Sequence, residues 1–346
     1  NGITRVSKVS VSADSTTGKL EIAQDSIIET LSHSGSSRID IADTKTLTLN
    51  NAFEIPSGKS MEFPGAGGGT LSLADKLTLS GTLKVKAADT IKDGTLSLKG
   101  GTLEVSQDAS IESLLLHEAS SEVNVASGKV LTYSGAALDI GAFELTLSGG
   151  GAVSTTNAFT LNDPASVLAF KGIEQISAVA VTGELSSGMF SVVNDALIET
   201  LSHTGSSRLD ISNDTELAIQ NLFEVPQDKS MELVGTDSGT LVLGDQLTLS
   251  GTLKLKATDT IKGGTLSLKG GTIEASQNAS IASTLLNEAN SEVNVASGKV
   301  LTYSGPALDI GARTLTLSGG GKFANGADLK LNNTASVLLL KGIQQI

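Results

Sequence analysis

The sequence contains no cysteine and no tryptophan, and aromatic residues make up only 3% of its 346 residues. Without cysteine, neither a disulfide framework nor a thiolate metal site can form, so hydrogen bonds and packing must supply the stability. Apolar residues still make up 39% of the chain. We therefore expect a packed core made mainly of Leu, Val, Ile and Ala.

Basic residues, proline and long apolar runs are also scarce. The chain has 24 basic against 37 acidic residues, a net charge of −13, which argues against a nucleic-acid partner because phosphates are bound by clustered Lys and Arg. No apolar run approaches the ~20 residues that span a bilayer, and Asn1 does not open a signal peptide. With 5 prolines and 38 glycines, the composition favours many tight turns between short strands.

The chain repeats itself at a constant offset of 170 residues. LSHSGSSRID from Leu31 returns as LSHTGSSRLD from Leu201, and residues 121–135 recur unchanged at 291–305. We interpret residues 1–170 and 171–340 as two units, and 341–346 as the start of a third, so that the chain is a piece cut from a longer array. Repeats of fixed length indicate units that stack and bury faces they could not bury alone.

Within each unit, pairs of apolar residues two positions apart recur roughly every seven or eight residues, with polar residues between them. The pairs include Val123/Val125, Val130/Thr132, Leu138/Ile140, Leu145/Leu147, Phe159/Leu161 and Val167/Ala169. Gly-rich turns separate them. This rhythm predicts an all-β, right-handed parallel β-helix, or β-solenoid, with three short strands in a coil of ~22 residues and coils ~4.8 Å apart. Each unit would hold about eight coils. A β-sandwich is the alternative, although its strands are usually longer.

The segments GTLSLKGGTLEVSQDASI, SEVNVASGKVLTYSGAALDIG and ELTLSGGG resemble the right-handed β-helical stalks of bacterial surface proteins, such as autotransporter passengers and filamentous-haemagglutinin-like adhesins. The resemblance is one of pattern and covers most of each unit. It implies a secreted protein, located outside the cell or on a bacterial cell surface, in which a long stalk displays adhesive or effector regions.

One group of residues invites a catalytic interpretation. It comprises His33, Ser36, Ser37, Arg38 and Asp40, repeated as His203, Ser206, Ser207, Arg208 and Asp210. Ser, His and Asp together can form a hydrolase triad. However, if Ile39 and Ile41 point inward, Arg38 and Asp40 are outward neighbours on one strand, and an exposed ion pair preceded by a turn explains them. We expect no catalytic role.

Other candidates are equally well explained as structural. His117 becomes Asn287 in the second copy, so we expect a solvated turn residue. Several carboxylates could in principle serve a polysaccharide-degrading enzyme. Because they alternate with lysines, we expect them to lie on a solvated strand face instead. These are Asp89, Asp93, Glu104 and Asp139, with Asp259, Glu274 and Asp309 in the second copy. Asn51, Asn124, Asn221 and Asn294 are expected to form amide ladders along the stack.

The sequence therefore predicts no catalytic, cofactor-binding or metal-binding residue, no cofactor, and a protein that is not an enzyme. The predicted function is a structural stalk or fibre segment of a secreted or cell-surface repeat protein such as an adhesin, whose partners are neighbouring units of the same chain. Two alternatives stay open. One is a glycan- or protein-binding module that uses a flat face or the divergent segment 151–158, which we expect to be an exposed loop. The other is a polysaccharide-degrading β-helix enzyme.

Overall fold

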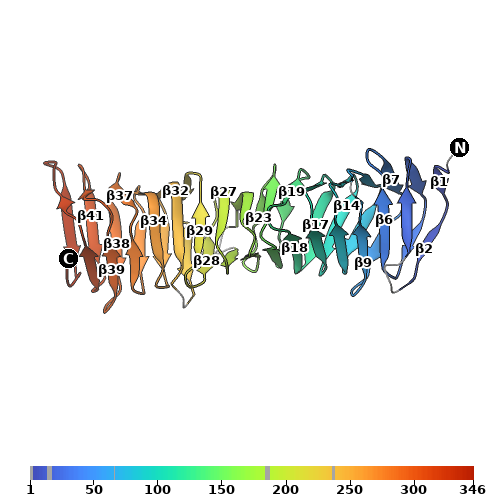
Figure 1. Ribbon diagram of the computed structural model, residues 1–346. Coiled ribbons are helices and arrows are strands. Elements are labelled where there is room, and N and C mark those ends of the chain that lie inside the picture. The colour runs from blue at the N-terminus through green and yellow to red at the C-terminus, as the bar shows by residue number, and fades with distance from the viewer. Residues whose placement is uncertain (1–2, 14–17, 66, 184–187, 236–237) are drawn as a thin grey trace. The chain divides into compact units, whose positions relative to one another are not determined.

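The structure, a computed structural model, describes residues 3–13, 18–65, 67–183, 188–235 and 238–346. Within these ranges all regular elements are β-strands, and they stack as a parallel β-solenoid of about 15 turns (Figure 1). This confirms the predicted fold class and excludes a β-sandwich, whose sheets are antiparallel. The described residues contain no helix that could cross a membrane. The chain divides into two compact units, one of residues 1–159 with 171–178 and the other of residues 160–170 with 179–346.

In the first unit each coil has a first, a second and a third strand, and strands of one kind form one face. The first face contains β1 (Arg5–Val6), β4 (Ser26–Ile28), β7 (Thr46–Leu49), β10 (Thr70–Leu73), β13 (Thr90–Lys92), β16 (Ala109–Ile111), β19 (Val130–Tyr133) and β22 (Ala152–Thr155). The second face contains β2 (Val9–Val11), β5 (Leu31–His33), β8 (Phe53–Ile55), β11 (Lys76–Leu79), β14 (Thr95–Lys99), β17 (Leu114–Ala119) and β20 (Leu138–Asp139). The third face contains β3 (Lys19–Ile22), β6 (Ser37–Ile41), β9 (Ser60–Phe63), β12 (Thr82–Val85), β15 (Thr102–Val105), β18 (Ser121–Val125) and β21 (Glu144–Ser148).

Three strands lie at the boundary between the units in sequence: β23 (Phe159–Leu161), β24 (Val167–Lys171) and β25 (Gln175–Val181). In the second unit β27 (Ala196–His203), β32 (Thr240–Leu249) and β34 (Thr260–Leu268) each run through the first and second positions of a coil. The separate first strands are β29 (Glu216–Ile219), β36 (Ala279–Ile281), β39 (Val300–Tyr303) and β42 (Lys322–Asn325). The separate second strands are β30 (Phe223–Val225), β37 (Thr284–Asn287), β40 (Leu308–Asp309) and β43 (Leu329–Lys330). The third strands are β26 (Met189–Val192), β28 (Ser207–Ile211), β31 (Ser230–Val234), β33 (Thr252–Leu255), β35 (Thr272–Ala275), β38 (Ser291–Val295), β41 (Thr314–Ser318) and β44 (Val337–Lys341).

The strand register fixes the length of a coil. Lys19 pairs with Arg38, 19 residues on, and Ser121 pairs with Leu145, 24 residues on. These values bracket the predicted coil of about 22 residues. Along most strands buried and partly exposed residues alternate, so that one residue in two enters the core. Leu71 and Leu73, for example, are both 1% exposed, whereas Thr70 and Ser72 face outward.

The predicted inward pair Val130/Thr132 is wrong by one residue, and the pair Val167/Ala169 is wrong for Val167. In β19 the core residues are Leu131 and Tyr133, while Val130 is 37% exposed. In β24 the residues Leu168, Ala169 and Phe170 are all buried, so the prediction is correct for Ala169, whereas Val167 is only partly buried. Because side chains alternate with a period of two, a shift of one residue exchanges the two faces of a strand. The larger side chains, Tyr133 and Phe170, occupy the core because they bury more apolar surface there than Val130 or Val167 would.

Candidate functional site

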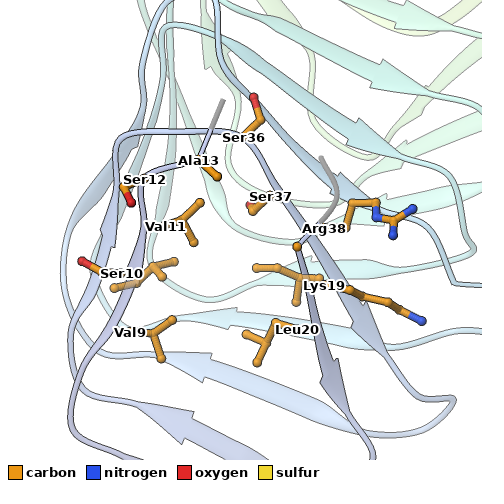
Figure 2. A pocket seen from close by; sticks show the side chains of 13 residues that line it. Val9, Ser10, Val11, Ser12, Ala13, Lys19, Leu20, Ser36, Ser37 and Arg38 are labelled. Carbon is orange, nitrogen blue, oxygen red and sulfur yellow. The ribbon is translucent and has the colours of Figure 1, made fainter. Parts of the chain in front are cut away.

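The histidines of the predicted catalytic group lie in the core. His33, at the end of β5, is 7% exposed, and its Nε2 lies 2.9 Å from the Oγ of Ser37 on β6. His203 and Ser207 repeat this pair at 2.9 Å, with the serine fully buried. Ser207 is 0% exposed, so no substrate carbonyl could reach it without displacing the core, whereas Ser37 borders a cavity of about 350 Å³ (Figure 2). Both histidines are buried, and each pair serves to satisfy buried polar atoms.

The third member of a triad is missing from this arrangement. Asp40 lies three residues after Ser37 on β6 and so faces the opposite side of the strand. Its carboxylate is 2.6 Å from the ammonium of Lys19, the neighbour of Arg38 in the strand register. The predicted outward position of Asp40 is thus correct, but Lys19 is the basic partner that contacts it. The structure does not assemble a Ser-His-Asp constellation here.

The prediction that His117 is a solvated turn residue is wrong. His117 lies in β17 and is 9% exposed, and its Nδ1 is 2.8 Å from the carbonyl oxygen of Ile140 in the next coil. The second strand of that coil, β20, is only two residues long and ends before Ile140. The imidazole therefore supplies a hydrogen bond that a longer strand would have supplied. Burial lowers the pKa of His117, which keeps the ring neutral near pH 7.

Asn287 explains why the sequence could change at this position. Its Nδ2 donates to the carbonyl oxygen of Ile310 at 3.0 Å, the counterpart of the bond from His117. Both side chains place a donor nitrogen at the same distance from their own backbone, which is why either residue fits. In the sequence, the change from His117 to Asn287 suggested that the position has no shared function. In the structure, both residues make the same hydrogen bond to the next coil.

We expect His117→Asn to lower the free energy of unfolding by less than about 1 kcal/mol, because one hydrogen bond replaces another. His117→Leu should cost about 1–3 kcal/mol, because it leaves the carbonyl of Ile140 buried without a donor. Urea unfolding of both variants at pH 7.5 measures the difference. Asn287→His and Asn287→Leu form the matched pair in the second unit. Equal losses for Asn and Leu at position 117 would contradict this role.

The carboxylates considered for catalysis serve turns and coil contacts. Asp139 and Asp309 each accept the backbone N–H two residues on, at 2.8 and 2.9 Å. Asp89 is 4% exposed and accepts the N–H of Gly69 at 2.9 Å, and Asp259 does the same for Gly239 at 2.8 Å. The expectation of a solvated face is therefore wrong for Asp89 and Asp259. Burial raises the pKa of Asp89 to about 6.

Two of the asparagines that were expected to form amide ladders, Asn51 and Asn221, bond to the backbone instead. Asn51 accepts the N–H of Leu31 at 2.7 Å and donates to its carbonyl oxygen at 3.0 Å. Asn221 makes the same two bonds to Leu201. The side-chain amide thus makes the two hydrogen bonds that the backbone of a paired strand would make to the preceding coil. Because the bonds go to backbone atoms and not to other amides, the predicted amide ladder is not what these residues form.

The divergent segment 151–158 is a strand over half of its length, and only Thr156 and Asn157, in the bend that follows, are exposed as predicted. Residues 152–155 form β22, paired in parallel with β19, and Val153 is 1% exposed. Its counterpart Phe323 is equally buried in β42. The sequences AVST and KFAN both place an apolar residue second, so they fold alike in spite of their different composition. Within the strand the divergence changes the core side chain from Val153 to Phe323 and leaves the pairing unchanged.

A polar groove recurs on the outside of both units. In the first it is a cavity of about 310 Å³ lined by Gly100–Thr102, Ser120–Glu122, Glu144 and Thr146. In the second it is about 210 Å³ and is lined by Gly270–Thr272, Asn290–Glu292 and Thr316. Sequence reasoning missed both grooves. Parts of both linings belong to segments that recur unchanged, GTLSLKGGT at 94–102 and 264–272 and residues 121–135 at 291–305, and these were used only to define the repeat.

Hydrogen bonds hold the carboxylate of each groove in place. The hydroxyl of Ser148 donates to Glu122 at 2.5 Å and accepts from the Nδ2 of Asn124 at 2.8 Å. Glu292, Ser318 and Asn294 repeat the arrangement. Hydroxyl, amide and carboxylate groups of this kind can hydrogen-bond a polar ligand. Neither groove contains a histidine, and all three histidines of the chain are buried elsewhere.

The charges of the two grooves differ. In the first, Glu144 forms a 2.9 Å ion pair with Lys171, and this hydrogen bond lowers the pKa of the carboxyl group. The counterpart of Glu144 is Thr314, which carries no charge. A ligand that both grooves bind would therefore depend on the shared Glu122 and Glu292. In the described part of the chain, no three His, Asp or Glu side chains gather closely enough to hold a metal ion.

Comparison with known proteins adds no further assignment. The chain matches no family model, no curated protein and no solved structure.

Proposed function

We propose that the chain is a structural stalk segment of a secreted or cell-surface repeat protein, with the task of holding other regions at a distance. The observation that carries the proposal is the stacking within each unit. Parallel ladders run from coil to coil, and Leu77, Leu96 and Leu115 of successive coils lie in register in the core. A coil that contacts mainly its two neighbours can be added or removed without a change in the rest, which suits a spacer of adjustable length.

The candidate side chains support the same proposal by what they do. His117, Asp89 and Asn51 each bond to a neighbouring coil and so hold coils together, and His33 joins two strands of one coil. A stalk needs such contacts and needs no assembled catalytic centre. If the protein is displayed on cells, an antibody raised against the chain should label intact, unpermeabilised cells of its source. Labelling only after permeabilisation would contradict the surface location.

The recurrent polar groove favours one second candidate, a module that binds glycans or proteins. A glycan array probed with the chain separates the two functions. The stalk proposal expects no specific signal. The binding module predicts a signal that disappears in the double variant Glu122→Gln, Glu292→Gln. The same signal should persist in the control Glu112→Gln, which lies on the exposed surface. This result would favour the binding module over the stalk.

The enzyme alternative has its own assay. Incubation with pectin, alginate and hyaluronan should release no product if the chain is a stalk. Product release that is abolished by Asp139→Ala together with Asp309→Ala would overturn the proposal. Because both carboxylates close turns, circular dichroism must first show that the variant is folded.

A further inference from the structure

The carboxylate that the two polar grooves share has no basic side chain beside it. Glu104, one coil before Glu122 on the third face, forms an ion pair with Lys84 at 3.2 Å. Within the described ranges no lysine or arginine lies within ion-pair distance of Glu122 or of its counterpart Glu292. Both carboxylates are partly buried. A cation from outside the chain could therefore form an ion pair here that no residue of the chain already forms.

Hydroxyl groups stand on both sides of this carboxylate. In the strand register Thr102 and Thr146 are the partners of Glu122 in the preceding and the following coil. Adjacent strands lie ~4.8 Å apart, which is less than twice an N–H···O distance of ~2.9 Å. A nitrogen atom that lies between the carboxylate and either threonine can therefore donate a hydrogen bond to both.

The second unit repeats this row of side chains although its surroundings differ. Thr272 and Thr316 are the strand partners of Glu292, so a hydroxyl, a carboxylate and a hydroxyl again follow one another. At the edge of the first groove lies Glu144, and its counterpart in the second unit is Thr314. The feature that both grooves keep is thus the row itself and not the charge around it.

Glycine leaves the space beside the row open. A Cβ added to Gly100 would have only the carbonyl oxygen of Ser120 near it, at 4.0 Å, and one added to Gly270 would have only that of Asn290, also at 4.0 Å. Both glycines have a positive φ, of 84° and 88°, which side-chain-bearing residues rarely adopt. The backbone conformation at these two positions therefore keeps the chain from filling its own grooves.

The groups in the grooves select a ligand by its chemistry. The carboxylate repels anions, and the described residues gather no three His, Asp or Glu side chains around a metal ion. No aromatic side chain is among the described residues that line either groove, whereas quaternary ammonium ions are bound by aromatic cages. A primary ammonium group has three N–H donors and no acceptor, which matches a carboxylate flanked by hydroxyls.

We infer that each groove binds a primary alkylammonium group, supplied by a lysine side chain of a partner polypeptide or by one end of a free polyamine. The nitrogen lies between Glu122 and one of its two threonines, and in the equivalent place beside Glu292. The net charge of −13 attracts the cation to both sites. Because each site offers one ion pair near the surface, we expect a Kd on the order of millimolar. The inference goes beyond the stalk function and can fail without affecting it, since a stalk needs no ligand.

An NMR titration of the full ¹⁵N-labelled chain with a capped peptide that carries a single lysine tests the inference. The amide signals of the rows around Glu122 and Glu292 should shift and saturate. Glu122→Gln should weaken binding at least ~10-fold in the first groove only, and Glu292→Gln in the second only, because each removes one charged acceptor. The matched control Glu104→Gln removes a carboxylate that already has a basic partner, and both sites should persist. Unchanged signals elsewhere show that each variant is folded.

The same peptide with trimethyllysine separates hydrogen bonding from charge. It keeps the positive charge but has no N–H donor, so it should bind at least ~10-fold more weakly. Spermidine identifies the source of the ammonium, because it should bind as well as the peptide if the ammonium suffices and more weakly if a polypeptide is the partner. Equal binding of lysine and trimethyllysine would overturn the inference. So would shifts that survive both glutamine variants, or no shift in either groove up to ~20 mM peptide.

Discussion

Gly81→Ala should destabilise the first unit by about 4 kcal/mol or more, a loss typical of a backbone position that cannot admit a side chain. Gly81 lies at the corner between β11 and β12. A Cβ at this position would lie 2.3 Å from the carbonyl oxygens of both Lys59 and Pro56 in the preceding coil. These atoms are backbone, so a side-chain rotation cannot relieve the clash. The N–H of Thr82 donates to the carbonyl of Lys59 at 2.9 Å, and moving that oxygen would break the ladder.

Urea unfolding followed by circular dichroism measures this loss. Gly18→Ala is the matched control, because its added Cβ meets nothing within 4 Å, and its free energy of unfolding should change by less than about 0.5 kcal/mol. Gly101→Ala should resemble Gly81→Ala, since its Cβ would lie 2.3 Å from the carbonyl oxygen of Gly81. If Gly81→Ala and Gly18→Ala unfold at the same urea concentration, the coils are not stacked as closely as described.

His203 should make the protein less stable as the pH falls from 6.5 towards 4. Burial lowers the pKa of His203 to about 4, so the folded chain excludes a proton that the unfolded chain binds below its usual pKa of 6.5. Above pH 6.5 both states are neutral and the effect vanishes. The difference between a pKa of 6.5 and one of about 4 corresponds to about 3 kcal/mol in the free energy of unfolding. Most of this stability should be lost by pH 4.5.

A comparison with His203→Gln isolates this contribution. Glutamine can keep a hydrogen bond to Ser207 and does not titrate, so the variant should lose about 2–3 kcal/mol less than the wild type between pH 7.5 and 4.5. Asp89 has the opposite effect, because its raised pKa lets the folded state hold a proton up to about pH 6. Since both proteins contain Asp89, its contribution cancels. An NMR titration in which the His203 ring protonates between pH 6 and 7 would contradict the prediction.

The sequence was sufficient to predict the fold because its signals are local and repeated many times. Pairs such as Leu83 and Val85 mark a strand by themselves, and the register of successive coils follows from stacking them. The prediction failed where two residues competed for the core, as Val130 and Tyr133 do. A single strand cannot reveal which of its faces is covered when both carry an apolar residue.

The candidate site was harder to predict because its contacts join different coils. His117 and Ile140 are 23 residues apart, and nothing in the sequence near His117 shows that β20 will be too short to reach Ile140. Asp89 likewise appeared to belong to a charged outer face, but its carboxylate turns towards Gly69 in the coil before. At His117 the change to Asn287 looked like an absence of function, and it was informative only with the partner atom in view.

Distances between spin labels on the first face test the stacked coils most directly. Thr46, Thr70, Thr90, Ser110, Thr132 and Ser154 are successive partners in the strand register. The chain has no cysteine, so Thr46→Cys with Thr132→Cys, and Thr46→Cys with Ser154→Cys, can each be labelled specifically. At a strand spacing of ~4.8 Å, the account predicts narrow distributions near ~19 and ~24 Å, one strand spacing apart. Broad distributions, or a second distance no longer than the first, would contradict it.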